Sequence, residues 1–119
     1  MQRRPNRAPR IGGRIRTAAQ DVAGRRRLVV RVRLRVCDDS PGVLSAQVSQ
    51  RRALLGKIVA RGTFERRLPS LEGECSSYRF AWRTSPRFAG GATFVVEVRV
   101  RDADGAWSRE LGAVRGAGR

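Results

Sequence analysis

An alternation of apolar and basic residues between positions 28 and 36, interrupted by Val29 alone, constrains the fold most. Five aliphatic residues occupy the even positions and three arginines stand between them: Leu28, Val30, Val32, Leu34 and Val36 alternate with Arg31, Arg33 and Arg35. Side chains of a strand point to opposite faces with a period of two, whereas a helical face repeats every three or four residues. The pattern therefore predicts a strand with one buried and one exposed face.

The same period recurs along the rest of the chain. It predicts strands at 43–50, 58–66, 77–83, 93–101 and 106–113, and the strand at 77–83 carries the aromatic residues Tyr78, Phe80 and Trp82. Residues 38–42, 50–56, 68–76, 86–91 and 102–105 read as turns or connections. No stretch has a helical pattern of useful length. This arrangement predicts an all-β protein, an antiparallel β-sandwich of about seven strands.

The positive charge is concentrated at the N-terminus. The 119 residues suffice for one small domain and include 26 Lys or Arg against 10 Asp or Glu, a net charge of +16. All the basic residues except Lys57 are arginines, which GC-rich codon usage would supply without selection for function. Residues 1–36 hold 12 arginines and one acid, a net +11, and the remaining residues hold +5.

The N-terminal stretch has few apolar anchors. Ile11, Ile15 and Val22 are its only sizeable aliphatic residues, too few to favour ordering all of it. We therefore expect residues 1–27 to be a basic, mostly flexible arm with one edge strand around Gly13–Ala19. The sandwich domain is then expected at 28–114, followed by a frayed tail at 115–119.

Composition excludes most catalytic and metal chemistry. The chain has no histidine and two cysteines, which excludes zinc fingers, Ser-His-Asp triads and Cys-His dyads. The possible acid–base pairs are Glu72 with Glu74 and the aspartates of the turns at 38–42 and 102–105, but a small sandwich offers little room for a cleft. Four serines have no histidine to activate them: Ser40, Ser76, Ser77 and Ser108. We expect a protein that is not an enzyme and takes no cofactor.

No membrane or export segment is evident. No run approaches the roughly 18 to 20 apolar residues of a membrane span, and the first 27 residues lack the apolar core of about 7 to 15 residues that a secretory signal needs. We therefore expect no transmembrane segment and no signal peptide within these residues.

Residues 94–109, FVVEVRVRDADGAWSR, resemble the last hairpin of fibronectin type III and bacterial immunoglobulin-like domains. In that hairpin an alternating strand opens on an aromatic residue and ends in a small acidic turn. The resemblance extends over about residues 28–113 through strand order, and it implies a Greek-key sandwich. The chain departs from the pattern at Phe94, where the family's tyrosine corner would have a hydroxyl group, and it lacks the antibody-type disulfide.

The resemblance also implies a disulfide of a different kind. Its topology pairs the strand at 28–37 with the strand at 77–83, so Cys37 and Cys75 should meet, although two buried free thiols remain the alternative. A disulfide would place the protein outside the cell or at its surface. Because no export signal is present, we hypothesise that the chain is the C-terminal piece of a longer exported protein, or that its start is misassigned.

The same topology brings two acidic turns to one pole. These turns could offer Ca²⁺ oxygen ligands from Asp38, Asp39, Asp102 and Asp104. Aspartate is also an ordinary turn former, and the spacing lacks the acidic series of an EF-hand loop. We therefore treat calcium as a minor candidate and expect no metal.

Two functions remain. The first is a monomeric accessory, spacer or adhesion module of an exported bacterial protein, whose partner is an unknown protein or a cell-surface polymer. The second is non-specific binding of nucleic acid or another polyanion through the arm, although nucleic acid is not favoured because the aromatic residues have core spacing. The sandwich itself is expected to carry no single basic stripe. The arm residues of the second function are Arg3, Arg4, Arg7, Arg10, Arg14, Arg16, Arg25, Arg26 and Arg27.

Overall fold

The computed structural model describes residues 7–39, 42–88 and 93–115, except for the side chains of Val22 and Arg26. Its strands are β1 (Arg10–Val22), β2 (Arg25–Cys37), β3 (Leu44–Leu54), β4 (Lys57–Leu68), β5 (Cys75–Arg83), β6 (Thr93–Arg101) and β7 (Leu111–Arg115). A short 3-10 helix, η1 (Pro86–Phe88), follows β5. No helix in the described ranges is long and apolar enough to cross a membrane.

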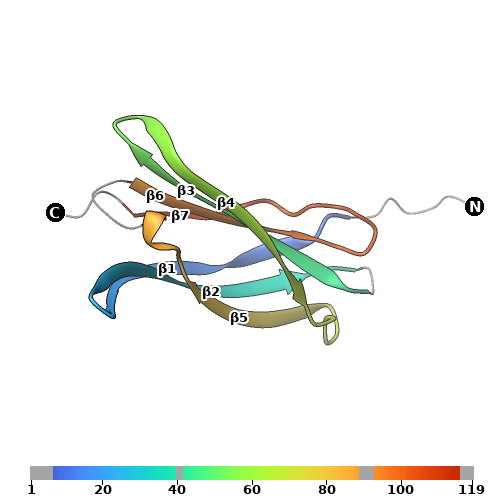
Figure 1. Ribbon diagram of the computed structural model, residues 1–119. Helices are drawn as coiled ribbons and strands as arrows, with labels where there is room; N and C mark the ends of the chain where they lie inside the picture. Colours follow the sequence, from blue (N-terminus) through green and yellow to red (C-terminus); the bar gives the residue numbers. More distant parts are fainter. Residues whose placement is uncertain (1–6, 40–41, 89–92, 116–119) are drawn as a thin grey trace, which may run out of the picture.

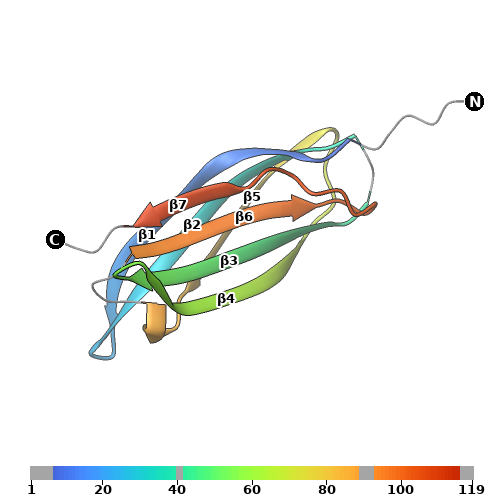
Figure 2. The same cartoon turned by 90° about the horizontal axis from the view of Figure 1, so that it is seen from above.

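The strands form two antiparallel sheets that pack face to face (Figure 1). The three-stranded sheet has the order β1-β2-β5, and the four-stranded sheet has the order β4-β3-β6-β7. Figure 2, seen from above, shows the strands of the two layers running along the same long axis. The predicted all-β sandwich of seven strands is confirmed.

The core lies between the two layers and follows the alternation of the sequence. Along most of β2, β3 and β6, alternate apolar residues turn inward because the partner sheet covers that face. They are buried: Leu28, Val30, Val32, Leu34, Val36, Leu44, Ala46, Val48, Phe94, Val96, Val98 and Val100. The aromatic strand β5 adds Phe80, and the half-buried Trp82 ring lies 5.0 Å from the Phe64 ring in an edge-to-face arrangement.

Strand β1 corrects the interpretation of the N-terminus as a mostly flexible arm. The edge strand exists, but it spans Arg10–Val22 and pairs with β2 along all 13 of its residues. Ile15 is buried and Ile11 packs against the core. Backbone hydrogen bonds to β2 order this segment despite its few apolar residues, and its arginines remain in water on the other face. Residues 1–6 of the expected arm lie outside the described residues.

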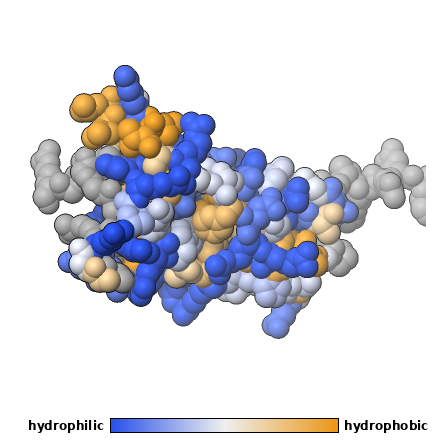
Figure 3. Space-filling model, viewed as in Figure 1, coloured by the Kyte–Doolittle hydropathy of each residue, from blue (hydrophilic) through white to orange (hydrophobic). Residues whose placement is uncertain are grey.

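The connection between β3 and β4 is shorter than expected. Residues 50–56 were expected to be a loop, but the two strands continue to a two-residue turn at Leu55 and Gly56. Both turn residues have positive φ, 52° and 80°, which suits the twist of a hairpin. The tip exposes four aliphatic side chains, Leu54, Leu55, Ile58 and Val59, visible as the apolar patch at the upper left of Figure 3.

The expected strand at 106–113 also shifts. Residues 102–110 are a loop in which Trp107 makes a single bridge to Arg101, and β7 begins at Leu111. Arg115, assigned to the frayed tail, closes β7 opposite Phe94, and the rest of that tail lies outside the described residues.

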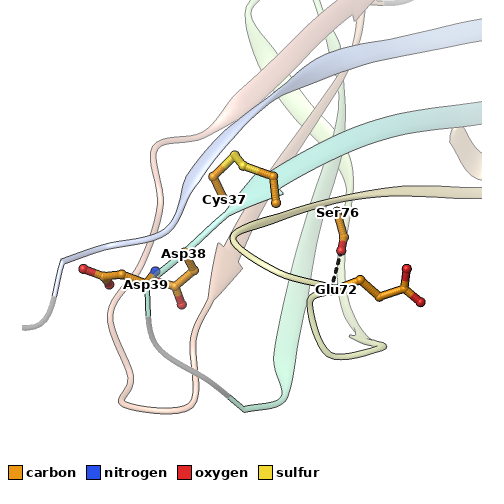
Figure 4. Close-up of a disulfide and its surroundings, with 6 residues drawn as sticks. Cys37, Asp38, Asp39, Glu72 and Ser76 are labelled. Atoms are coloured by element: carbon orange, nitrogen blue, oxygen red, sulfur yellow. Dashed lines mark hydrogen bonds between the residues drawn. A yellow bond between two sulfur atoms is a disulfide. The ribbon is translucent and has the colours of Figure 1, made fainter.

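The pairing of β2 with β5 brings the two cysteines together. Cys37 is the register partner of Cys75, their Cα atoms lie 4.1 Å apart, and the disulfide links positions 38 residues apart. Figure 4 shows the bridge at the end of β2, next to Asp38. The expected Cys37–Cys75 disulfide is confirmed, and it staples the two strands of the three-stranded sheet.

Candidate functional site

The outward face of the three-stranded sheet is covered by arginines. Because the even residues of β2 from Leu28 to Val36 are buried, its odd residues and their register partners on β1 and β5 point away from the core. These outward positions carry ten arginines, three from β1, five from β2 and two from β5: Arg10, Arg14, Arg16, Arg25, Arg27, Arg31, Arg33, Arg35, Arg79 and Arg83. No acidic residue occupies an outward position of these three strands as described. We call this set the arginine face.

A row of three arginines crosses the middle of the arginine face. Arg14, Arg33 and Arg79 are register partners on the three strands, and Arg16 stands opposite Arg31 in the next row. Neighbouring strands lie about 4.8 Å apart, so these like charges repel one another. Among the described residues, the single ion pair joins Arg51 to Glu97, on the other sheet. The arginine face therefore has no internal counter-charge.

Small residues open a depression at the same place. A hollow of about 910 Å³ is bordered by Arg14, Arg16, Arg31, Arg33 and Arg79. Ala81 also lines it, and its short side chain stands opposite Arg31, where a longer residue would fill the space. The arginine face thus has a concave centre with guanidinium groups around it.

Gly13 allows β1 to approach β2 beside this hollow. Its φ is +136°, and a Cβ atom there would overlap the carbonyl oxygen of Arg33. Any other residue would strain the backbone and push the two strands apart. Gly13 therefore sets the spacing of the central row.

The structure divides the residues predicted to bind polyanions. Five of them belong to the arginine face: Arg10, Arg14, Arg16, Arg25 and Arg27. Arg7 precedes β1 and is exposed, Arg26 stands in β2 opposite Asp21, and Arg3 and Arg4 lie outside the described residues.

The expectation that the sandwich has no single basic stripe is wrong. Joining β1 to β2 makes the charges of the arm and the body contiguous. The sequence placed Arg31, Arg33 and Arg35 on one outer face, but it did not show that the outward arginines of β1 and β5 join them. The signal that could have shown it is the alternation of Arg10, Arg14 and Arg16 with Ile11 and Ile15, which is the period of a paired strand.

The two acidic turns do meet at one pole, as the resemblance implied. A Cβ atom placed on Gly42 would lie 2.7 Å from the Cβ of Ala103, so the turns are in contact. Asp102 is buried, and its Oδ1 accepts hydrogen bonds from the backbone N–H groups of Asp104 and Ala106. Asp38 is also buried, and its Oδ1 accepts from the N–H of Asp39. These contacts are those of turn-forming aspartates.

The described ranges bring together no group of three or more carboxylates or thiols suited to a metal ion. Asp39 and Asp104 are exposed.

The carboxylates and serines considered for catalysis have local structural contacts. Glu72 and Glu74 are exposed, and the N–H of Glu72 donates to Ser76 Oγ over 2.7 Å (Figure 4). The hydroxyl of Ser108 accepts from the N–H of Val100 and donates to the carbonyl of Arg109. Ser77 is exposed opposite Arg35, and Ser40 lies outside the described residues.

One pair of acids is coupled, on the four-stranded sheet. A hydrogen bond from Glu110, followed by the contact with Arg51, lowers the pKa of Glu97. The same hydrogen bond and the charge of Glu97 raise the pKa of Glu110. Both side chains lie at the surface, away from the arginine face.

Comparison with known proteins identifies the fold. No protein-family model and no curated protein sequence matches this chain. Among solved structures, a β-glucuronidase from Bacteroides uniformis aligns with a TM-score of 0.63 at 12% identity, covering 94% of this chain and 14% of the enzyme. A putative β-galactosidase from Bacteroides fragilis aligns with a TM-score of 0.56 at 18% identity, covering 93% and 18%. The chain thus spans less than a fifth of these glycosidases, and its fold is that of one small part of a much larger protein.

Proposed function

We propose that the protein is a non-catalytic accessory module, of spacer or adhesion type, of an exported bacterial protein. The observation that carries this proposal is that 94% of the chain aligns with 14% of a glycosidase chain, which is the relation expected of a module. The Cys37–Cys75 disulfide supports an oxidising compartment, because disulfides are rare in cytosolic proteins.

Fractionation of the source cells tests the compartment. An antibody against the sandwich should detect it in the exported fraction, and alkylation without reductant should modify neither cysteine. A cytosolic protein with two alkylated thiols would contradict the proposal. The antibody should also detect a chain longer than 119 residues if the module belongs to a larger protein.

A second measurement tests the absence of catalysis. The isolated chain should not hydrolyse chromogenic β-glucuronides or β-galactosides, which are the substrate classes named for the similar structures. Hydrolytic activity that remains after purification and elutes with the protein in gel filtration would contradict this part of the proposal.

Polyanion binding is the second candidate function, and the arginine face favours it. The ten arginines of this face, with no acidic residue at an outward position of the described strands, attract negative charge, and a ligand would supply a counter-charge. Retention on a cation exchanger does not test this, since a net charge of +16 alone would cause it. The test is saturable binding of a soluble polyanion at low salt.

A further inference from the structure

We infer that the arginine face is a binding site for an acidic polysaccharide, held by its carboxylate or sulfate groups. The inference rests on the second function proposed above and adds the site and the class of ligand. It starts from the central row, Arg14, Arg33 and Arg79, which crosses all three strands beside the hollow of about 910 Å³.

The geometry of the row suits a chain of repeated anions. The backbone positions that carry the arginines are about 4.8 Å apart between neighbouring strands. Successive outward positions of one strand are about 6.8 Å apart. Each is a planar fork that can donate two parallel hydrogen bonds to one carboxylate or sulfate. In the described part of the chain, no side chain accepts a hydrogen bond from the arginines of the central row and no acid forms an ion pair with them.

The surroundings of the row argue against nucleic acid. Single-strand binding uses aromatic side chains on which bases stack, and the outward positions of β1, β2 and β5 carry no aromatic residue in the described part. Base reading in a duplex uses a helix or a two-stranded ribbon narrow enough for the major groove, and this face is three strands wide. The disulfide in this sheet further favours an extracellular polymer.

The experiment compares two triple variants of equal net charge. The site variant carries Arg14→Gln, Arg33→Gln and Arg79→Gln. The control variant carries Arg61→Gln, Arg67→Gln and Arg109→Gln, which are exposed arginines outside the arginine face. Binding of heparin, as the sulfated probe, and polygalacturonate, as the carboxylated probe, is measured by titration calorimetry at several salt concentrations. Thermal unfolding and the mass of the alkylated protein verify that each variant is folded and oxidised.

We expect the site variant to lose at least tenfold in affinity and the control variant less than threefold. The slope of log affinity against log salt should fall by about three in the site variant alone, one for each lost contact. Equal losses in the two variants would overturn the assignment of the site, because charge alone would then explain binding. No saturable binding by the full chain at low salt would refute the polyanion function itself.

Nucleic acid probes decide the class of ligand. Duplex DNA and oligothymidylate of matched charge should bind at least tenfold more weakly than the tighter of the two polysaccharides. If either bound as tightly, and bound through the same three arginines, the polysaccharide assignment would fall while the site would stand. A tenfold difference in affinity between heparin and polygalacturonate would show whether the guanidinium groups bind sulfate or carboxylate more tightly.

Discussion

The arginines on the outer faces of the two sheets differ in whether other side chains of the protein contact them. On the four-stranded sheet, Arg51 forms an ion pair of 2.9 Å with Glu97, and Arg99 Nε donates to Gln47 over 2.7 Å. The Arg99 guanidinium also lies 3.9 Å from the centre of the Trp107 ring. On the three-stranded sheet, the outward arginines face one another without such partners among the described residues. The partnered arginines of the four-stranded sheet stabilise the fold, whereas repulsion among the arginines of the three-stranded sheet lowers its free energy of unfolding.

This difference distinguishes arginines that contribute to stability from arginines that do not. Codon usage explains why the chain is rich in arginine, but it gives no reason for one face to lack every acid in its described outward positions while the other face has them. The binding site inferred above would give the arginines of this face a physical role. The following predictions disturb one face and use the other as reference.

The largest effect is expected from removing the disulfide that staples the arginine-bearing sheet. Replacing Cys37 and Cys75 with alanine should lower the free energy of unfolding by about 4 kcal/mol, because the cross-link closes a long loop in the unfolded chain. Urea unfolding of the variant measures this loss.

Hydrogen exchange in the same variant locates the effect. Protection should fall most in β2 and β5, near the former bridge, and least in β3 and β6. Uniform loss of protection in both sheets would contradict the view that the disulfide serves mainly the three-stranded sheet.

The next effect concerns the attachment of β1. Gly13→Ala should destabilise the sandwich by about 2 kcal/mol, because Gly13 has φ of +136° and its new Cβ would overlap the carbonyl oxygen of Arg33. Limited trypsin digestion should then cut β1 at its arginines faster than the rest of the protein. Gly12→Ala is the matched control. Its Cβ would meet no atom within 4 Å, and its stability should change by less than about 0.5 kcal/mol.

The disulfide and the β1 strand also show which parts of the structure could be predicted from the sequence. The alternation at 28–36 specified β2 and its buried face, and the cysteine pairing followed from the implied topology. An edge strand was predicted around Gly13–Ala19, but the full extent of β1 and its pairing with β2 were not. Gly13, Arg14 and Arg16 bury little surface and are ordered by backbone pairing with a partner that local patterns do not identify. The arginine face depends on that pairing, so it could not be assembled from separate segments. The connection at 50–56 was predicted too long, because a leucine with positive φ does not mark the position of a tight turn.

A pair of single substitutions should give opposite signs on the two faces. Arg33→Gln should stabilise the fold by about 0.5 kcal/mol, because it relieves repulsion from Arg14 and Arg79. Arg99→Gln should destabilise it by about 1 kcal/mol, because it removes the contact with Trp107 and the hydrogen bond to Gln47.

Urea unfolding at low and high salt measures both substitutions. The gain from Arg33→Gln should shrink at high salt, where screening already weakens the repulsion. If Arg33→Gln were as destabilising as Arg99→Gln, the two faces would not differ in the way described.

The smallest effect concerns the acids that accompany the paired face. The lowered pKa of Glu97 contributes stability above its ordinary range, and that contribution is lost as pH falls through the pKa of the folded state. The raised pKa of Glu110 works in the opposite sense, since its contribution is present at low pH and is lost as pH rises through its folded value. The two contributions have opposite signs and both carboxylates are largely exposed to solvent, so this pair should give the sandwich a weak pH dependence.

The substitution Glu110→Gln removes the contribution of Glu110 and leaves that of Glu97. The amide keeps a hydrogen-bond donor toward Glu97 and removes the second negative charge, so the variant should gain stability at neutral pH and little at pH 4. The gain should be only a few tenths of a kcal/mol, because both carboxylates are screened by solvent. Thermal unfolding at the two pH values measures it, with Glu65→Gln on exposed β4 as the reference. A gain as large at pH 4 as at pH 7 would show that the effect comes from packing and not from repulsion between the charges of Glu110 and Glu97, and Arg51 would then be held by Glu97 alone.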